Sequence, residues 1–289
     1  MVNPAKSDLA PGLYLIATPI GAARDITLRA LDLLASADML AAEDTRSLRK
    51  LMEIHGIALG DRPLVSYHDH NAGSAGPKIL RALAEGMSVV YASEAGTPMV
   101  SDPGFDLARK VTAEGHLLIS APGPSAAIAA LTLSGLPADR FFFAGFLPST
   151  QAKRKTALKA LEAVPGTLIF YESPRRAAAM LADAAEVLGG ERPAALCREL
   201  TKKFEEVLRD DLKTLAQTAA ERSFKGEIVV LVGGGGDSVN IREVDIDRAL
   251  REALKGGSVR DAADRVSAEL GVKRRVAYQR ALELEKGEE

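Results

Sequence analysis

Short apolar runs alternate with amphipathic segments along the first half of the chain. The apolar runs predict buried strands at 12–17, 39–42, 64–67, 88–92 and 117–120. The segments between them have helical spacing and predict helices at 25–37, capped by Asp25, and at 45–55, 77–85, 106–113 and 126–133. Strands that are separated by helices are typical of βαβ units, so we expect a largely parallel sheet.

The second half contains more strands for its length. Strands are predicted at 141–146, 168–171, 194–198, 205–208 and 228–232, and helices at 152–163, 177–188 and 212–222. This density favours a mixed sheet. After the glycines at 233–236, helical patterns begin at Ile246, Ser258 and Lys273, and Ser258 with Asp261 resembles a capping box.

The composition is that of an ordinary globular protein, with 47% hydrophobic and 26% charged residues among 289. A net charge of -2 argues against a uniformly basic nucleic-acid coat but leaves room for a local basic patch. Cys197 is the only cysteine, which excludes an intrachain disulfide and fits a reducing cytosol. Residues 1–11 lack a signal-peptide pattern, and no run of about 18 apolar residues would span a membrane. We therefore expect a cytoplasmic protein.

Two Gly/Pro-containing loops each follow a predicted strand and precede a predicted helix. They are Ser93-Glu94-Ala95-Gly96-Thr97-Pro98 and Pro122-Gly123-Pro124-Ser125-Ala126, and Thr18-Pro19-Ile20-Gly21 is a third such loop. Turns of this kind also occur as plain connections. Three of them at the carboxyl ends of a parallel sheet favour a site for a flat, nucleoside-sized ligand that approaches the main chain closely.

Several common site motifs are absent from the sequence. It has no phosphate loop ending in Gly-Lys-Ser/Thr, no Gly-x-Gly-x-x-Gly after the first strand and no Gly-x-Ser-x-Gly. These absences argue against a P-loop site, a dinucleotide Rossmann site and a serine hydrolase. His68 and His70 lack a third nearby ligand, so no metal site is predicted.

Charged residues follow predicted strands at three places. Glu43-Asp44-Thr45-Arg46 opens a helix, where acids also simply complement the helix dipole. Glu172-Ser173-Pro174-Arg175-Arg176 and Arg198-Glu199-Leu200-Thr201-Lys202-Lys203 follow two further strands. Solvated charge at strand ends is usual, but cations at three equivalent positions favour a single basic rim.

These motifs together resemble a known family. The matching stretches are Leu15 to Gly21, Asp25-Ile26-Thr27, Glu43 to Arg46, Ala95 to Pro98, Ser101-Asp102-Pro103-Gly104, Pro122 to Ala126, Tyr171 to Pro174 and Arg198 to Lys202. In this order they resemble the tetrapyrrole methylase superfamily of S-adenosylmethionine-dependent methyltransferases, and within it the bacterial small-subunit (16S) ribosomal RNA cytidine 2′-O-methyltransferases. The chain departs from the family pattern at Ala22-Ala23 (usually Asn-Leu), Glu94 (Asp), Arg175 (His) and Asp210 (commonly Gly).

The resemblance implies the fold, the cofactor and the partners. It implies two α/β domains of the tetrapyrrole methylase type, at 12–122 (acceptor side) and 123–236, with the S-adenosylmethionine cleft between them, and a small C-terminal helical extension at 240–289. The implied reaction is 2′-O-methylation of a cytidine ribose in the decoding region of 16S ribosomal RNA, within the small ribosomal subunit, by a homodimer. The cofactor-binding positions that it implies are Pro19, Glu94, Ala95, Gly96, Thr97, Val100, Ser125, Ala126, Tyr171 and Gly226.

Attack of a ribose hydroxyl on a sulfonium methyl depends above all on alignment, because the sulfonium is already an excellent leaving group. Glu43, Asp44 and Glu94 are all candidates to accept the hydroxyl proton, since each carboxylate lies beside a loop at the predicted sheet edge. The candidate RNA contacts are Arg24, Arg46, Arg175, Arg176, Arg198, Lys202, Lys273, Arg274 and Arg275.

The tail has more than one interpretation. Its apolar stripe fits a helical cap that packs on the body. Cations at the start of the last helix oppose the helix dipole, however, which favours an external anion such as RNA. Residues 258–284 also look superficially like a helix-turn-helix, so a DNA-binding regulator is one alternative, although it leaves the first 235 residues without a role. A methyltransferase of a small tetrapyrrole is another, although the basic groups favour a phosphodiester substrate.

Overall fold

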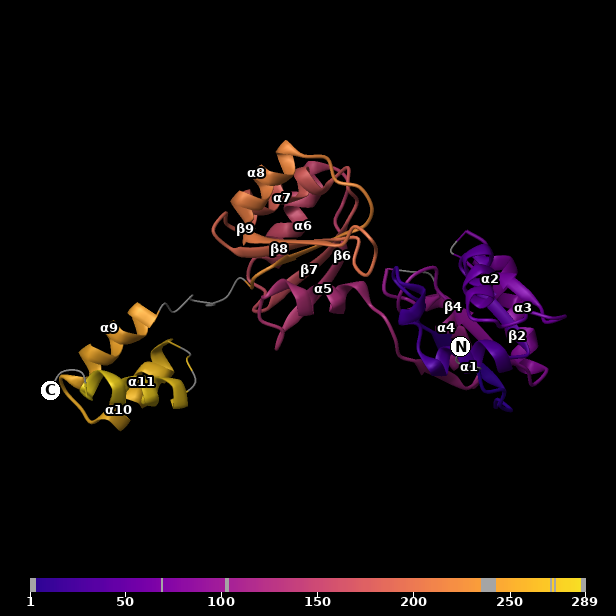
Figure 1. Cartoon of the computed structure of the whole chain (residues 1–289), viewed down its shortest axis with the longest axis horizontal. Helices are drawn as coiled ribbons and strands as arrows, with labels where there is room; N and C mark the ends of the chain where they lie inside the picture. Colours follow the sequence, from indigo (N-terminus) through magenta and orange to yellow (C-terminus); the bar gives the residue numbers. More distant parts are fainter. Residues whose placement is uncertain are drawn as a thin grey trace. The chain divides into compact units, whose positions relative to one another are not determined.

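The computed structural model divides into two compact units, Met1–Gly233 and Gly234–Glu289, which we call the large unit and the C-terminal unit (Figure 1). The structure describes residues 4–68, 70–101, 104–234, 243–270, 272 and 274–286. In the described part of the chain, no helix is both long and apolar enough to cross a membrane.

The large unit begins with a five-stranded sheet in the order β3-β2-β4-β1-β5. Its strands are β1 (Gly12–Ile16), β2 (Met39–Ala42), β3 (Leu64–Ser66), β4 (Ser88–Ala92) and β5 (Leu118–Ala121). Its helices are α1 (Leu28–Ser36), α2 (Thr45–Ile54), α3 (Ala72–Ala84) and α4 (Phe105–Ala113). All four strand pairs are parallel, which confirms the predicted βαβ arrangement.

Helices cover both faces of this sheet. On one face, α1 and α2 pack against alternate strand residues such as Ile16, Leu40 and Val90. On the other, α3 and α4 pack against the residues between them, among them Leu15 and Tyr91. Because β1, β2 and β4 are buried along their whole length, they read as nearly continuous apolar runs, which is why the sequence predicts them well.

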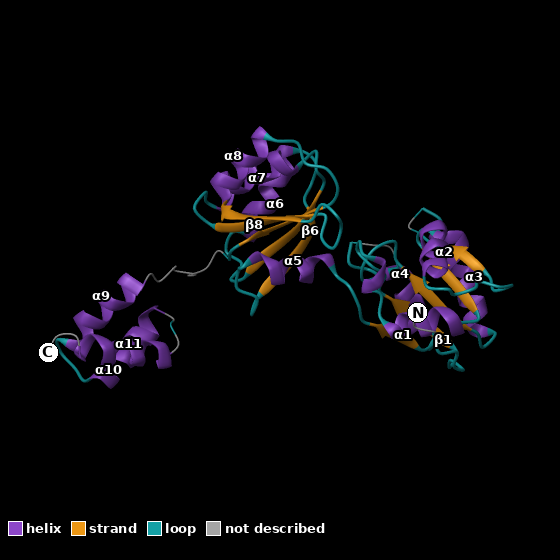
Figure 2. Ribbon diagram, viewed as in Figure 1, coloured by secondary structure: helices purple, strands orange, loops and turns teal. Residues whose placement is uncertain are grey.

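A second five-stranded sheet follows, in the order β6-β7-β10-β8-β9. Its strands are β6 (Phe141–Phe146), β7 (Thr167–Glu172), β8 (Pro193–Arg198), β9 (Glu206–Asp211) and β10 (Ile228–Val232). β6 and β7 are parallel and the other pairs are antiparallel, so the predicted mixed sheet is confirmed. Figure 2 shows α6 (Gln151–Leu161), α7 (Ala177–Leu188) and α8 (Leu212–Glu221) on one face and α5 (Ala126–Ser134) on the other.

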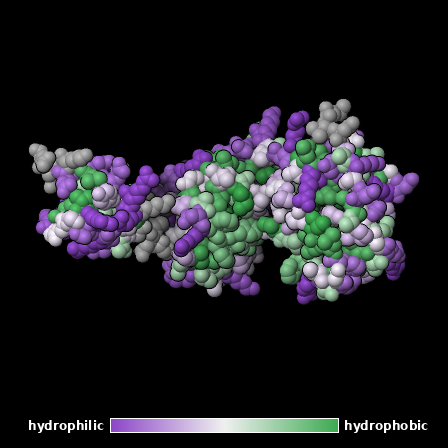
Figure 3. Space-filling model, turned by 90° about the horizontal axis from the view of Figure 1, so that it is seen from below, coloured by the Kyte–Doolittle hydropathy of each residue, from purple (hydrophilic) through white to green (hydrophobic). Residues whose placement is uncertain are grey.

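Helix α5 is apolar around much of its circumference. Ala127, Ala130 and Leu131 pack on the second sheet, whereas Ile128 and Leu133 remain exposed. Figure 3, which views the molecule from below Figure 1, shows hydrophobic residues gathered on this face of the second-sheet region. An apolar outer face on a surface helix marks a potential contact surface.

Two predicted helix starts are wrong. Asp25 does not cap α1, because residues Ala23–Asp25 form a separate turn of 3-10 helix and Thr27 is the cap, its Oγ1 accepting a hydrogen bond from Ala30 N at 3.2 Å. Helix α3 begins at Ala72 rather than Pro77. Its first turns contain Gly73 and Gly76, so propensity predicts a loop, but packing against the buried Tyr67 outweighs propensity there.

The C-terminal unit is a three-helix module of α9 (Glu243–Leu254), α10 (Val259–Leu270) and α11 (Arg274–Lys286). It has its own core, built from Ile246, Leu250, Ala253, Ala262, Val266, Ala281 and Leu284. The predicted capping box is confirmed, since Asp261 N donates to Ser258 Oγ at 3.2 Å and Ser258 N donates to Asp261 Oδ2 at 3.3 Å. The predicted glycine hinge and Lys273 lie largely outside the described residues.

Candidate functional site

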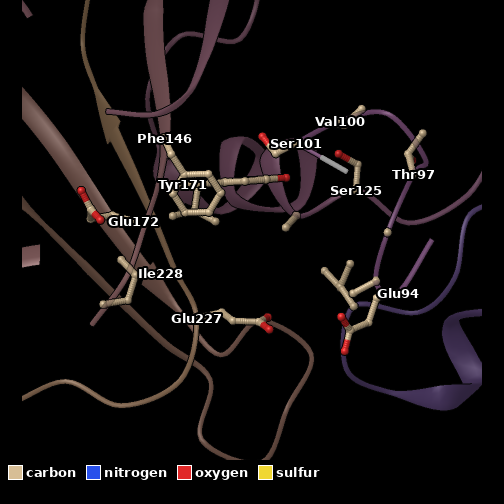
Figure 4. A pocket seen from close by; sticks show the side chains of 15 residues that line it. Glu94, Thr97, Val100, Ser101, Ser125, Phe146, Tyr171, Glu172, Glu227 and Ile228 are labelled. Carbon is tan, nitrogen blue, oxygen red and sulfur yellow. The ribbon is translucent and has the colours of Figure 1, made fainter. Parts of the chain in front are cut away.

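One end of each sheet of the large unit contributes to a cavity of about 360 Å³ (Figure 4). Its lining consists of Ile20, Glu94, Ala95, Gly96, Thr97, Val100, Ser101, Ser125, Ala126, Phe146, Tyr171, Glu172, Glu227, Ile228 and Val229. Small-molecule sites measure about 300–1,000 Å³, so this cavity has the size for a nucleoside-like ligand.

The cavity collects most of the positions expected to bind the cofactor. Its walls include the predicted residues Glu94, Ala95, Gly96, Thr97, Val100, Ser125, Ala126 and Tyr171. Pro19 and Gly226 do not line it, but their neighbours Ile20 and Glu227 do.

The loop after β4 is held against the loop after β1. Thr18 and Gly96 exchange backbone hydrogen bonds, with Thr18 N to Gly96 O at 2.9 Å and Gly96 N to Thr18 O at 3.0 Å. Ser93 Oγ also donates to Gly96 O at 2.7 Å. Gly96 has a φ of +87°, a conformation that suits glycine. This small bridge therefore fixes the main chain of the cavity wall.

Beyond Gly96, the same loop is tied to the next one and carries strained residues. Thr97 Oγ1 donates to Pro124 O at 2.9 Å, which joins the loops after β4 and β5. Met99 and Ser101 have φ values of 69° and 63°. Left-handed conformations of residues other than glycine cost about 1–3 kcal/mol each and cluster at functional sites.

Aromatic side chains form the wall on the second sheet. The rings of Phe146 and Tyr171 meet edge to face, with centroids 5.7 Å apart (Figure 4). Ala127 N, in the first turn of α5, donates to the Tyr171 hydroxyl at 3.2 Å. Tyr171 thus links the strand end to the start of α5, where Ser125 and Ala126 enter the cavity wall.

The loop after β1 also contacts the loop between β8 and β9. Ala22 N donates to Thr201 Oγ1 at 3.0 Å. Lys202 Nζ lies 3.1 Å from Glu199 Oε1 and 3.0 Å from Glu227 Oε2, so it anchors a carboxylate of the cavity wall. Figure 4 shows the Glu227 and Glu94 side chains extending toward one another.

The three candidate bases occupy different environments. Asp44 caps α2, and the hydrogen bonds from the Arg46 side chain and from Arg46 N lower the pKa of Asp44. Glu43 Oε2 accepts a hydrogen bond from Glu94 N at 3.2 Å, so it supports the loop. Only Glu94 among the three lines the cavity.

The predicted RNA contacts fall into two groups. Arg24, Arg46, Arg175, Arg274 and Arg275 are exposed. Arg176, Arg198 and Lys202 are partly buried and bind internal partners: Arg176 Nη2 donates to Leu147 O at 2.6 Å, Arg198 Nε pairs with Glu206 Oε2 at 3.1 Å, and Lys202 pairs with its two glutamates.

The cation that begins the last helix has an internal partner. Arg274 does begin a helix, where its charge opposes the dipole, but its guanidinium pairs with Asp264 of α10. An internal anion therefore accounts for this cation, and the dipole argument for an external anion does not hold for Arg274.

Seven lining residues were not predicted: Ile20, Ser101, Phe146, Glu172, Glu227, Ile228 and Val229. The sequence points to Glu172 only as part of a charged segment after a predicted strand and of the stretch Tyr171 to Pro174 that resembles the family. It is fully buried, its Oε1 accepting from Ser173 N at 2.7 Å and its Oε2 lying 3.2 Å from Arg176 Nη2. The position of Glu227 and Ile228 depends on strand pairing, since antiparallel β10 brings Ile228 opposite Glu172 at the end of β7.

The charge of the cavity favours a cationic ligand. The described lining residues include the carboxylates Glu94, Glu172 and Glu227 but no lysine, arginine or histidine, although Glu172 and Glu227 are paired with Arg176 and Lys202 outside the lining. A cavity lined by one sign of charge favours a ligand of the opposite sign. S-Adenosylmethionine, with a sulfonium and an ammonium against one carboxylate, carries a net positive charge and has the size of this cavity, so the residues present fit it.

Comparison with known proteins identifies the family. The model of the tetrapyrrole (corrin/porphyrin) methylases matches residues 12–216, and that of the RsmI C-terminal HTH domain matches residues 241–285. The chain is 50% identical over 277 residues to ribosomal RNA small subunit methyltransferase I of Mesorhizobium japonicum, covering 96% of this chain and 93% of that protein. It is 39% identical over 284 residues to the protein of the same name from Bacillus subtilis, covering 94% of each.

A solved structure shows the same fold at low identity. It is uroporphyrin-III C-methyltransferase from Thermus thermophilus complexed with S-adenosylhomocysteine, with a TM-score of 0.54 and 19% identity, covering 77% of this chain and 97% of that one. The chain therefore belongs to the tetrapyrrole methylases, a family of S-adenosylmethionine-dependent methyltransferases, and within them to the ribosomal RNA small subunit methyltransferase I family.

Proposed function

We propose that this chain methylates the ribose 2′-hydroxyl of a cytidine in the decoding region of 16S ribosomal RNA, with S-adenosylmethionine as the donor. The observation that carries the proposal is a carboxylate-lined cavity of nucleoside size in a chain that is 50% identical to a ribosomal RNA small subunit methyltransferase I. The choice of the cytidine 2′-oxygen is supported by the motifs in which the sequence resembles such enzymes.

The cavity residues divide the binding of the donor among them. The backbone of Ala95 to Thr97 and of Ser125 and Ala126 would approach it closely, while Ile228 and Phe146 would cover its apolar parts. Bound S-adenosylmethionine supplies an electrophilic methyl group on sulfur. Binding requires no metal in this account, so calorimetry should give the same affinity with and without a chelator.

Glu94 is the side chain that we assign to the hydroxyl proton. Asp44 is engaged as a helix cap and Glu43 supports the loop, whereas the Glu94 carboxylate faces the cavity. It would accept the proton at a carboxylate oxygen late in the transfer. Alignment of the ribose oxygen by the surrounding loops would supply much of the barrier reduction.

Exposed cations would hold the RNA phosphates. The side chain of Arg46 is 90% exposed even though it pairs with Asp44, and surface pairs of this kind contribute little stability. Arg46 therefore loses little by turning toward a phosphate. Arg24 and Arg175 are exposed on the same unit, and Arg275 on the C-terminal unit.

A small tetrapyrrole is the alternative substrate, since uroporphyrin-III C-methyltransferase shares the fold. That structure covers 77% of this chain. The HTH-type module at 241–285 is an addition that a small substrate does not require, and it supports a macromolecular one. A DNA-binding regulator would leave the cavity unexplained.

Methyl transfer from labelled S-adenosylmethionine tests this function. Purified protein should label small subunits or 16S RNA from a strain that lacks the enzyme, and nuclease digestion should release 2′-O-methylcytidine. The Glu94→Gln variant keeps the size of the side chain but loses the base and one carboxylate of the cavity, so it should transfer slowly even at saturating donor. A labelled methyl group on a base instead of the ribose would contradict the proposal. Labelling of a tetrapyrrole with no labelling of RNA would also contradict it.

We also propose that the protein is a homodimer. The exposed apolar face of α5, with Ile128 and Leu133, supports this, because an apolar helix face gains stability when a partner covers it. Light scattering of the purified protein tests it, and a monomer at micromolar concentration would contradict it.

A further inference from the structure

Phe204 is a large apolar side chain that the large unit leaves in solvent. It lies in the loop between β8 and β9 and is 63% exposed. A single exposed apolar residue is common and by itself indicates nothing. The structure of the loop and the neighbours of the ring distinguish this one.

Hydrogen bonds within the loop fix the backbone around Phe204 and keep its side chain exposed to solvent. Lys202 N donates to Glu199 O at 3.0 Å, Glu205 N donates to Lys202 O at 3.1 Å, and Thr201 N donates to Glu205 Oε2 at 2.6 Å. Glu199 and Thr201 have φ values of 51° and 62°. Strained residues of this kind persist only where the surroundings determine them, so the outward position of the ring is built into the loop.

The same loop borders the cavity. Thr201 Oγ1 accepts from Ala22 N at 3.0 Å, next to the loop that supplies Ile20 to the cavity wall. Lys202 contacts Glu227 of the wall at 3.0 Å. Phe204 is two residues further along the chain and is not among the lining residues.

A cation accompanies the ring. Lys203 Nζ lies over one face of the Phe204 ring, 5.6 Å from its centroid, so a base would stack on the other face. An aromatic face with an adjacent lysine is the combination that binds unpaired RNA, because a base stacks on the ring while the ammonium meets a phosphate. An apolar protein surface would instead have to bury the lysine charge at a cost. We propose that Phe204 is a stacking platform for an unpaired base of the RNA substrate; this rests on the proposed function.

Four variants test the proposal with an unmethylated 16S RNA transcript. Phe204→Ala removes the ring, Phe204→Leu keeps apolar surface without a π face, and Phe204→Trp keeps a π face. Phe141→Ala is the matched control, since Phe141 is also exposed but lies at the opposite end of β6 from the cavity residue Phe146. RNA affinity, donor affinity and oligomeric state are measured for each.

The Ala and Leu variants should lose about 5- to 150-fold in RNA affinity, the range for one stacked base, while Trp and the control remain near wild type. Donor affinity should not change. If Phe204→Leu binds RNA as tightly as wild type, the ring does not stack on a base and the proposal is wrong. A changed oligomeric state in Phe204→Ala would show that this surface binds a second copy of the chain instead. A wild-type protein that neither binds nor methylates RNA would refute the proposed function itself, whereas active wild type with fully active Phe204→Ala refutes only the stacking role.

Discussion

Gly21 is a position where one added methyl group should disturb the cavity. An added Cβ would lie 2.5 Å from Thr201 Oγ1, 2.6 Å from Lys202 Cγ and 3.0 Å from Leu200 O. All three atoms belong to the strained, hydrogen-bonded loop between β8 and β9, so the neighbours have little room to give. Gly21→Ala therefore forces the loop after β1 away from the loop between β8 and β9.

The magnitude follows from overpacking, which costs about 1–3 kcal/mol. Ile20 lines the cavity beside Gly21, and Lys202 anchors Glu227, so both sides of the site shift when the loops separate. At about 1.4 kcal/mol per tenfold, we expect S-adenosylmethionine affinity to fall about 5- to 150-fold. Gly21 has no left-handed φ, so backbone strain does not contribute.

Calorimetry with S-adenosylmethionine measures the effect, and circular dichroism verifies that the variant is folded. Gly73→Ala is the matched control, because a Cβ there meets nothing within 4 Å and the residue lies in α3. That control should bind the donor as wild type does and gain slightly in stability. A folded Gly21→Ala protein with unchanged donor affinity and transfer rate would refute the reasoning.

Three further outcomes are expected. Arg46→Ala should weaken RNA binding and reduce the salt slope of that binding by about one, while donor affinity stays unchanged. Lys202→Ala should also change donor affinity, because Lys202 anchors Glu227. RNA titrations at several salt concentrations and calorimetry with the donor distinguish the two variants. A chain ending after Gly236 should fold and bind the donor but methylate ribosomal substrate poorly. Full activity of this truncated chain would show that the C-terminal unit has no role in substrate binding. Burial raises the pKa of the Cys197 thiol to about 11, so at pH 8 a thiol reagent should label unfolded protein far faster than native protein, and equal rates would contradict this burial.

The sequence predicts the strands well for a physical reason. Strands buried on both faces, such as β4, are apolar runs without ambiguity. Helix starts are predicted less well, because the first turns of α3 depend on packing against Tyr67 and not on local propensity.

The two sides of the cavity differ in the same way. Gly/Pro loops after parallel strands can be recognised in the sequence, so Gly96 and Ser125 could be predicted as site residues. Glu227 could not, because it reaches the cavity through the antiparallel pairing of β10 with β7, and strand register is invisible in one sequence. The binding partner of Lys202 could not be predicted either, because a lysine binds a phosphate and a carboxylate equally well and the structure pairs it with Glu227.

Mapping of ribose methylation on 16S ribosomal RNA tests the central claim most directly. RNA from a strain without this enzyme should lack 2′-O-methylation at one cytidine of the decoding region. The wild-type gene should restore the methyl group, and a Glu94→Gln gene should restore it poorly. An unchanged methylation map in the deletion strain would contradict the account.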